Sequence, residues 1–585
     1  MSTQEQRTTY EAGSPSGDDA AGGAAQPAGV IGVLGAGTMG NGIAQLAARS
    51  GARTLLYDPF AEALARGLAS ARDGLAKEAA KGRLDEEQAA RAAEQLQPVD
   101  DLAALGGCEL VIEAAPERLE LKHEMYGRLS EIVGEGCVLA SNTSSLLVTA
   151  IARGATHPER VVGMHFFNPA PVMRLLEVVA GVESSQRALD VALATGEAMG
   201  KTVILAKDGP GFIVNRCNRP FALEALRMLQ EQLADVESID RICRMEGGFR
   251  MGPFELMDLV GVDTGLEISE SFYAQSYGEP RWRPSMIAAR QVAAGRYGRK
   301  SGRGYYDYSD PARYRAPDPE PPPGDTPAAG EAGAAQPARP AGEGVVVISG
   351  EGAVADELRA AAGAAGYEVR SPHDPTGGVL PALVIECDAA PAATVDELGA
   401  APQPDRRGAP SPPAQGGARL LLCARGSLAA IDPDGSSVGF HLLPPLAQSH
   451  MVELTRGEGS SPVAAARAER FFAALGKHVQ WVGDAPGLVL GRIVCQIINE
   501  SAFALGEGVG SAHDIDTGMV LGLSHPRGPF EWADAIGLEH VLGVLEALCE
   551  EYREERYRPA PALRRLVRSG RLGLASGAGF FDYGE

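Results

Sequence analysis

The stretch VIGVLGAGTMG, Val30–Gly40, decides the fold of the first half of the chain. Its apolar run Val30–Leu34 predicts a buried strand, and a helical pattern covers Asn41–Ser50. Another apolar run, Thr54–Tyr57, predicts the next strand. A strand, a glycine-rich turn, a helix and a second strand in this order are typical of an α/β unit with a parallel sheet.

The three glycines of the turn have separate mechanical roles in a dinucleotide-binding unit. Gly35 allows the tight turn, Gly37 lets a pyrophosphate approach the backbone, and Gly40 lets the helix pack on the strand. The helix N-terminus then offers free N–H groups to the phosphates. Asp58 directly follows the second predicted strand, where a carboxylate can bind the adenosine ribose, and no arginine comes just after it. We therefore predict NAD rather than NADP as the cofactor.

Length and composition narrow the class of protein. A chain of 585 residues is too long for one core, so several domains are expected. The net charge of −23 argues against nucleic acids and anionic membranes as partners. Eight cysteines without CxxC or metal-ligand spacing predict free thiols and no metal site. With no apolar run long enough to span a membrane and no signal pattern, we expect a cytoplasmic protein.

A histidine and a glutamate stand twelve residues apart in VVGMHFFNPAPVMRLLEVV, Val161–Val179. The apolar run Val161–Met164 leads to His165, a proline-broken turn follows, and a second apolar run carries Glu177. Two strands joined by this turn would bring the imidazole and the carboxylate face to face. Such a pair suits a general base with its orienting partner, although a core histidine held by an acid has the same pattern.

Two further motifs complete a family resemblance. ASNTSSL, 140–146, follows a predicted strand at Val138–Ala140, and DGPGFIVNR spans Asp208–Arg216. Together with GAGTMG and the histidine stretch, they resemble the short-chain 3-hydroxyacyl-CoA dehydrogenase family, from about Gly29 to Tyr308. The resemblance implies an α/β Rossmann-type NAD-binding domain followed by an all-α domain. It also implies reversible oxidation of an L-3-hydroxyacyl-CoA to the 3-ketoacyl-CoA, with NAD accepting the hydride.

The same resemblance implies catalytic roles at matching positions. His165 would remove the hydroxyl proton, and Glu177 would orient its ring. Ser144 and Asn215 would donate hydrogen bonds to the reacting oxygen and the thioester carbonyl of the substrate.

It also implies binding roles for four other residues. Glu117, Lys122 and Asn142 match positions at which relatives contact NAD. Lys81 matches a lysine that contacts the CoA phosphates, but Gly74 stands where some relatives have an accompanying serine. The CoA contacts are therefore the least defined part of the predicted site.

The chain repeats itself after a Pro/Ala/Gly-rich linker. His441 and Glu453 are again twelve residues apart. The number of residues from His165 to His441 equals the number from Glu177 to Glu453. DGPGF returns as DAPGL and SGRGYYDY as SGAGFFDY. A repeat of this fidelity indicates two copies of one architecture. The predicted segments are a disordered tail (1–28), a Rossmann domain (29–207), a helical domain (208–308), the linker (309–343), a degenerate Rossmann-like domain (344–483) and a second helical domain (484–585).

The second copy lacks much of the predicted site. Its glycine loop, Gly350–Ala355, carries a glutamate and ends in alanine, and Gly491 replaces Asn215. The stretch between its glycine loop and its histidine is also shorter, so part of the nucleotide domain is missing. We predict that this copy is inactive, that His441 is structural, and that its helical domain pairs with the first as an internal pseudo-dimer, with a homo-oligomer as the other possibility.

Alternatives to the leading function stay open at this point. Two-copy relatives include enzymes of phenylacetate breakdown that act on 3-hydroxyadipyl-CoA, and 3-hydroxybutyryl-CoA dehydrogenases, and no residue decides between these acyl chains. An NAD-dependent dehydrogenase of a free hydroxy or sugar acid would fit the loss at Gly74. A non-catalytic NAD-binding protein would be expected to lack the predicted catalytic residues, and all of them are present.

Overall fold

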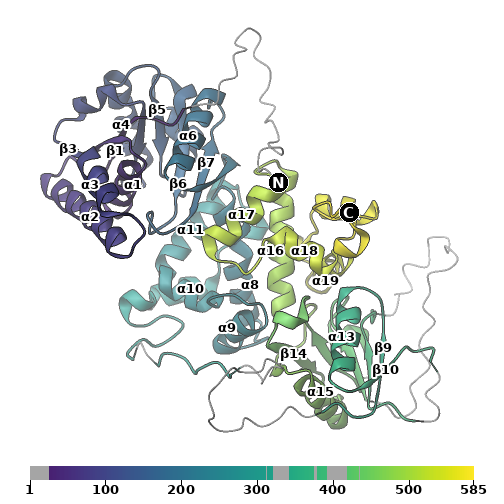
Figure 1. The fold of residues 1–585 in the computed structure, drawn as a ribbon. Helices are drawn as coiled ribbons and strands as arrows, with labels where there is room; N and C mark the ends of the chain where they lie inside the picture. The colour runs from purple at the N-terminus through teal and green to yellow at the C-terminus, as the bar shows by residue number, and fades with distance from the viewer. Residues whose placement is uncertain are drawn as a thin grey trace. The chain divides into compact units, whose positions relative to one another are not determined.

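The computed structural model describes residues 26–310, 313–320, 341–374, 379–391, 418–433 and 435–584 (Figure 1). Most of the predicted tail and most of the predicted linker lie outside these residues. The chain divides into two compact units. The first is Met1–Arg216 with Glu507–Leu523, and the second is Cys217–Gly506 with Ser524–Glu585.

The first unit is built on an eight-stranded sheet with the order β3-β2-β1-β4-β5-β6-β7-β8. All neighbouring strands are parallel except β6 and β7. The order of β3 to β5 is that of the Rossmann fold, which confirms the predicted fold class. The strands are β1 (Val30–Leu34), β2 (Arg53–Tyr57), β3 (Leu96–Val99), β4 (Leu110–Glu113), β5 (Val138–Ser141), β6 (Val161–Phe166), β7 (Leu175–Ala180) and β8 (Thr202–Lys207).

The helix after the glycine turn begins earlier than predicted. It starts at Thr38 and not at Asn41, because Gly37 is its N-cap and the first turn forms within the glycine motif. Two helices, α2 and α3, lie between β2 and β3. The helices of this unit are α1 (Thr38–Arg49), α2 (Ala61–Ala80), α3 (Glu86–Gln95), α4 (Leu119–Ile132), α5 (Val148–Ala152), α6 (Gln186–Ala198), α7 (Val214–Cys217, at its edge) and α17 (Ala512–Leu523).

The second unit contains most helices of the two predicted helical domains, while α17 belongs to the first unit. Helix α8 of the first copy packs against α16 of the second (Figure 1). Almost all residues of α16 are buried. The helices are α8 (Arg219–Gln230), α9 (Val236–Met245), α10 (Pro253–Val260), α11 (Val262–Gln275), α12 (Met286–Ala293), α16 (Leu490–Gly506), α18 (Pro529–Ile536), α19 (Leu538–Tyr552) and α20 (Pro561–Arg568).

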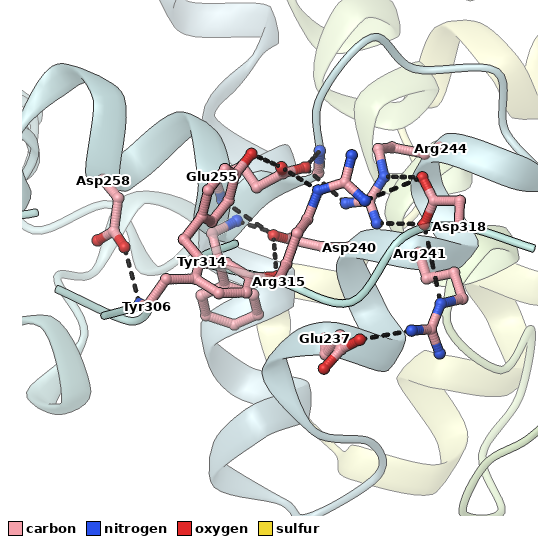
Figure 2. A network of polar contacts seen from close by, with 12 residues as sticks. Glu237, Asp240, Arg241, Arg244, Glu255, Asp258, Tyr306, Tyr314, Arg315 and Asp318 are labelled. Carbon is pink, nitrogen blue, oxygen red and sulfur yellow. Dashed lines mark hydrogen bonds and ion pairs between the residues drawn. The ribbon is translucent and has the colours of Figure 1, made fainter. Parts of the chain in front are cut away.

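Two buried aspartates tie GPFE, 252–255, a motif that recurs at 528–531, to the SGRGYYDY motif of the first helical domain (Figure 2). Asp240 accepts hydrogen bonds from the backbone N–H groups of Phe254 and Glu255 and from the Tyr306 hydroxyl. Burial raises the pKa of Asp240 to about 7. Asp258 accepts the backbone N–H of Tyr306. These motifs therefore close the helical domain and are structural.

The second unit also holds a seven-stranded sheet with the order β10-β9-β11-β12-β13-β14-β15. It repeats the first sheet without a counterpart of β3 among the described residues, which confirms a duplicated fold with a truncated second Rossmann unit. Its elements are β9 (Val345–Ser349), α13 (Ala353–Ala364), β10 (Glu368–Arg370), β11 (Leu383–Glu386), β12 (Arg419–Leu422), α14 (Leu428–Ile431), β13 (Val438–His441), β14 (Met451–Arg456), α15 (Pro462–Ala474) and β15 (His478–Trp481).

Candidate active site

The predicted histidine–glutamate pair forms on the antiparallel strands β6 and β7. His165 and Glu177 are direct partners in the register, and His165 Nδ1 lies 2.7 Å from Glu177 Oε2. Both residues are buried. The other carboxylate oxygen, Oε1, accepts the backbone N–H groups of Ile213 (3.1 Å) and Val214 (3.0 Å). With Nδ1 bound to a fixed carboxylate, Nε2 is the ring nitrogen that can accept a proton from a substrate.

Two aromatic rings flank the imidazole. The Phe167 ring centroid lies 4.6 Å from that of His165, and the Phe212 centroid lies 5.8 Å from it. Phe212 is fully buried. These contacts fix the ring plane and limit the access of water to the face of the pair.

Glu117 organises the loop that follows β5. Its Oε1 accepts the Thr143 hydroxyl (2.5 Å) and the backbone N–H groups of Ser144 (3.0 Å) and Ser145 (3.1 Å). Burial opposes ionisation of this carboxyl, but Lys122 and these donors hold its pKa below its usual range. Glu117 is therefore an anchor for the loop that carries Ser144, which is exposed.

Lys122 lies behind Glu117 and is only 1% exposed. Its ammonium group is 2.7 Å from Glu113 and 3.3 Å from Glu117. Glu113, at the end of β4, also accepts the Ser141 hydroxyl. Lys122 thus supports the carboxylates and presents no free ammonium group. Its partner Glu113 was missed from the sequence, although a carboxylate that ends a buried apolar strand is a usable signal.

The last two predicted polar residues lie beside the histidine strand. The Asn142 side-chain oxygen accepts the backbone N–H of Phe166 at 2.9 Å, which links the ends of β5 and β6. Asn215 is half-buried on α7, next to Val214, whose N–H group holds Glu177. The carboxyl ends of parallel strands line the ligand crevice of such sheets.

The glycine turn fits a dinucleotide. Gly35 has φ +102°, which favours glycine, and a Cβ at Gly37 would meet no atom within 4 Å, so the backbone there is open to a phosphate. A Cβ at Gly40 would lie 1.8 Å from the Gly35 carbonyl oxygen. Asp58 accepts the backbone N–H groups of Ala36 (2.8 Å) and Phe60 (2.9 Å), which sets its carboxylate beside the turn.

Packing explains the glycine at position 74. The space beside Gly74 is filled by the Gln45 side chain, since a Cβ at Gly74 would lie 2.1 Å from Gln45 Oε1. Gln45 in turn donates to Glu78 at 3.0 Å. Lys81 is exposed at the end of α2. A serine at position 74 would therefore require the Gln45 side chain to move.

The second histidine is not paired with its glutamate. His441 and Glu453 are partners in the strand register, yet His441 Nε2 lies 3.2 Å from His540 Nε2, and its buried Nδ1 has no hydrogen-bond partner. A Cβ at Gly491 would lie 2.2 Å from His441 Cε1, so the ring occupies the space of a side chain at that position. Burial holds the pKa of His441 well below its usual range.

Glu453 keeps only its backbone contacts. Its carboxyl accepts the N–H groups of Val489 (2.7 Å) and Leu490 (2.8 Å), as Glu177 does in the first copy. Burial raises the pKa of Glu453 to about 8. The second copy therefore repeats the backbone frame of the first without its charge pair. Among the described residues, no cluster of His, Cys, Asp or Glu could hold a metal ion.

The comparisons with known proteins agree with this geometry. Family models match the NAD binding domain of 3-hydroxyacyl-CoA dehydrogenase at residues 30–209 and its C-terminal domain at both 211–308 and 487–583. A 3-hydroxyadipyl-CoA dehydrogenase of Escherichia coli is 35% identical over 542 residues, 92% of this chain and 98% of the relative. The chain belongs to the 3-hydroxyacyl-CoA dehydrogenase family.

Shorter relatives match one copy alone. A probable 3-hydroxybutyryl-CoA dehydrogenase of Bacillus subtilis is 41% identical over 48% of this chain and 96% of its own length.

A solved structure matches both copies. The match to a crystal structure of 3-hydroxybutyryl-CoA dehydrogenase from Escherichia coli covers 93% of this chain and 99% of that chain, with a TM-score of 0.72 and 33% identity. NAD is therefore the cofactor of this family member. In the described part of the chain, no helix has the length and apolarity needed to cross a membrane.

Proposed function

We propose that the first copy oxidises L-3-hydroxyacyl-CoA to 3-ketoacyl-CoA reversibly, with His165 as the general base. The observation that carries this proposal is the buried 2.7 Å contact between His165 and Glu177 in the unit that holds the glycine turn. When bound, NAD supplies the acceptor for the hydride that leaves C3 of the substrate. The hydroxyl proton passes to Nε2 of His165, and the C3–O bond becomes a carbonyl.

Glu177 stabilises the imidazolium that forms, because its charge faces Nδ1 across a short hydrogen bond. Ser144 and Asn215 donate hydrogen bonds to the reacting oxygen and the thioester carbonyl. Gly35, Gly37, Gly40 and Asp58 hold the cofactor, with Glu117, Lys122 and Asn142 shaping its nicotinamide end, and Lys81 binds the CoA phosphates.

The substrate is a short 3-hydroxyacyl-CoA, either 3-hydroxybutyryl-CoA or 3-hydroxyadipyl-CoA. Both acyl chains are supported by the names of relatives. A free hydroxy or sugar acid is the alternative, and the glycine at position 74 is the residue on its side.

We expect NADH oxidation with acetoacetyl-CoA and with 3-ketoadipyl-CoA, and turnover with free acetoacetate at least about 100-fold lower, because remote binding energy of the CoA group is used at the reacting carbon. Steady-state assays of NADH absorbance with the three substrates at equal concentration check this. Faster turnover of free acetoacetate than of either CoA ester would replace this proposal by the free-acid alternative.

The second copy is an inactive partner for the first helical domain. Arg492 of α16 is fully buried, 2.9 Å from Glu224 and 2.6 Å from Glu231 of the first copy. A reciprocal pair of contacts joins Arg556 to Glu224 (2.5 Å) and Arg281 to Glu500 (2.8 Å). Glu500 is the counterpart of Glu224 in the sequence repeat, so the two copies contribute equivalent residues. This arrangement supports an internal pseudo-dimer. All eight cysteines are free, which supports the cytoplasm as the site of action.

A further inference from the structure

A helix of the second copy belongs to the catalytic unit. Helix α17 lies in the duplicated half of the sequence but packs on β7 and β8 of the first sheet. The loop before it is joined to that sheet, because the Val509 carbonyl accepts the backbone N–H of Lys207 at 2.7 Å. Residues 507–523 of the second copy are therefore part of the unit built on the first sheet.

Small residues let α17 approach the turn that holds Glu177. A Cβ at Gly518 would lie 3.0 Å from both Ile204 Cδ1 and Val214 Cγ2, and 3.4 Å from Ile213 Cγ2. The N–H groups of Ile213 and Val214 are the backbone donors to Glu177. The backbone of α17 therefore packs directly behind the donors that fix the carboxylate.

The same helix lies behind the histidine. A Cβ at Gly522 would lie 3.2 Å from Val214 Cγ1 and 3.4 Å from Phe167 Cε1. The Phe167 ring packs against the imidazole of His165 at 4.6 Å. One helix thus contacts the side chain next to the base and the turn next to its partner.

An ion pair links the start of this segment to the residue that follows Asn215. Arg216 Nη2 lies 2.8 Å from Glu507 Oε2, and Arg216 is buried next to Asn215. The segment 507–523 therefore contacts the neighbours of His165, of Glu177 and of Asn215.

The inactive copy differs at the equivalent position. There the corresponding helix is α9, which packs on β14, and Glu246 is the counterpart of Gly522 in the sequence repeat. Glu246 is buried, and its two carboxyl oxygens have no hydrogen-bond partner. In that copy the histidine is turned away from its glutamate. In the first site, where His165 contacts Glu177, this position is Gly522. In the second copy, where His441 does not contact Glu453, it is the buried Glu246.

We propose that α17 of the second copy is a positioning element for the His165–Glu177 pair of the first. The inactive copy then contributes to the reaction by holding the Ile213–Val214 turn and Phe167 in place. This inference rests on the proposed function, and its test compares the kcat of a variant with the kcat of the wild-type protein. Absence of wild-type turnover with every CoA ester would refute the proposed function itself.

The first test replaces Gly518 by leucine or by alanine. Displacement of the turn should lower kcat with acetoacetyl-CoA roughly 10- to 100-fold for Gly518→Leu, and less for Gly518→Ala. KM values should stay within about threefold of wild type, because substrate and cofactor contacts remain. The primary isotope effect with 4-deuterated NADH should rise as hydride transfer limits the rate. NADH affinity by fluorescence should stay close to wild type, and circular dichroism should show the variant folded at the assay temperature, although overpacking lowers its unfolding midpoint.

The matched control is Gly363→Leu, an exposed helical glycine of α13 beside which a Cβ meets no atom within 4 Å. It should leave kcat unchanged. Wild-type kcat in Gly518→Leu would overturn the proposal, and so would an equal loss in the control or a loss of activity that follows a loss of folded protein.

A second pair of variants avoids the packed interior. Glu507→Gln removes the charge partner of Arg216. Arg492 is the counterpart of Arg216 in the second copy, and Glu231→Gln removes its charge partner. We expect kcat to fall about threefold to tenfold in Glu507→Gln and to stay at the wild-type value in Glu231→Gln. Equal effects of the two substitutions on kcat, or none from Glu507→Gln, would contradict a positioning role for the segment.

Discussion

Replacing His165 by alanine is expected to lower turnover by about 10²- to 10⁴-fold, because the reaction then loses its general base. The matched variant is His441→Ala in the second copy. His441 is fully buried, its Nε2 contacts His540, and no charge pair forms with Glu453. Its loss should leave turnover within about twofold of wild type, at some cost in stability from the cavity.

Both variants are compared by NADH oxidation with acetoacetyl-CoA at neutral pH. NADH affinity and the unfolding midpoint are measured in parallel, so that a loss of fold is distinguished from a loss of chemistry. His165→Ala should keep its NADH affinity, since the glycine turn and Asp58 are untouched. Comparable losses of turnover in the two variants would show that the second copy is active.

The second large effect is expected from Glu177→Gln. Glutamine keeps the shape of the side chain but removes the charge that stabilises the imidazolium. It also turns an N–H₂ group either toward His165 Nδ1 or toward the backbone donors of Ile213 and Val214. We expect kcat to fall roughly 10²- to 10⁴-fold and the free energy of unfolding to fall by about 1–3 kcal/mol.

The matched variant Glu453→Gln should leave kcat at the wild-type value but lower the free energy of unfolding by about 1–3 kcal/mol. Each oxygen of Glu453 accepts one backbone N–H, from Val489 or from Leu490, and the NH₂ group of glutamine cannot accept such a bond. Steady-state kinetics and denaturant unfolding of both variants check the difference. Wild-type kcat in Glu177→Gln would mean that His165 works without an orienting partner.

The parts of the fold predicted from the sequence are those set by local patterns. The run Val30–Leu34 and the glycines after it specify strand, turn and helix, because each glycine meets a steric need that the structure shows. The facing of His165 and Glu177 was also predicted, since two apolar runs around a proline-broken turn favour an antiparallel pair. The repeat predicted the second sheet and its helices.

The features that the sequence did not predict depend on contacts between distant residues. His441 and Glu453 keep their spacing, but the ring turns into the space left by Gly491 on α16. Lys122 is buried between two carboxylates, which no local pattern indicates. The packing of α17 on the first sheet joins segments from the two halves of the chain. In each case tertiary packing decides the role of a side chain whose local sequence is uninformative.

The central claim is that one chain holds one dehydrogenase site, built by the first copy and supported by the second. The most direct test is the number of NADH molecules bound per chain, measured by calorimetric titration of the full-length protein at a known concentration. One NADH per chain is predicted, with binding lost when Gly40 is replaced by valine, because a Cβ there would collide with the Gly35 carbonyl oxygen. Two NADH molecules per chain would contradict the account.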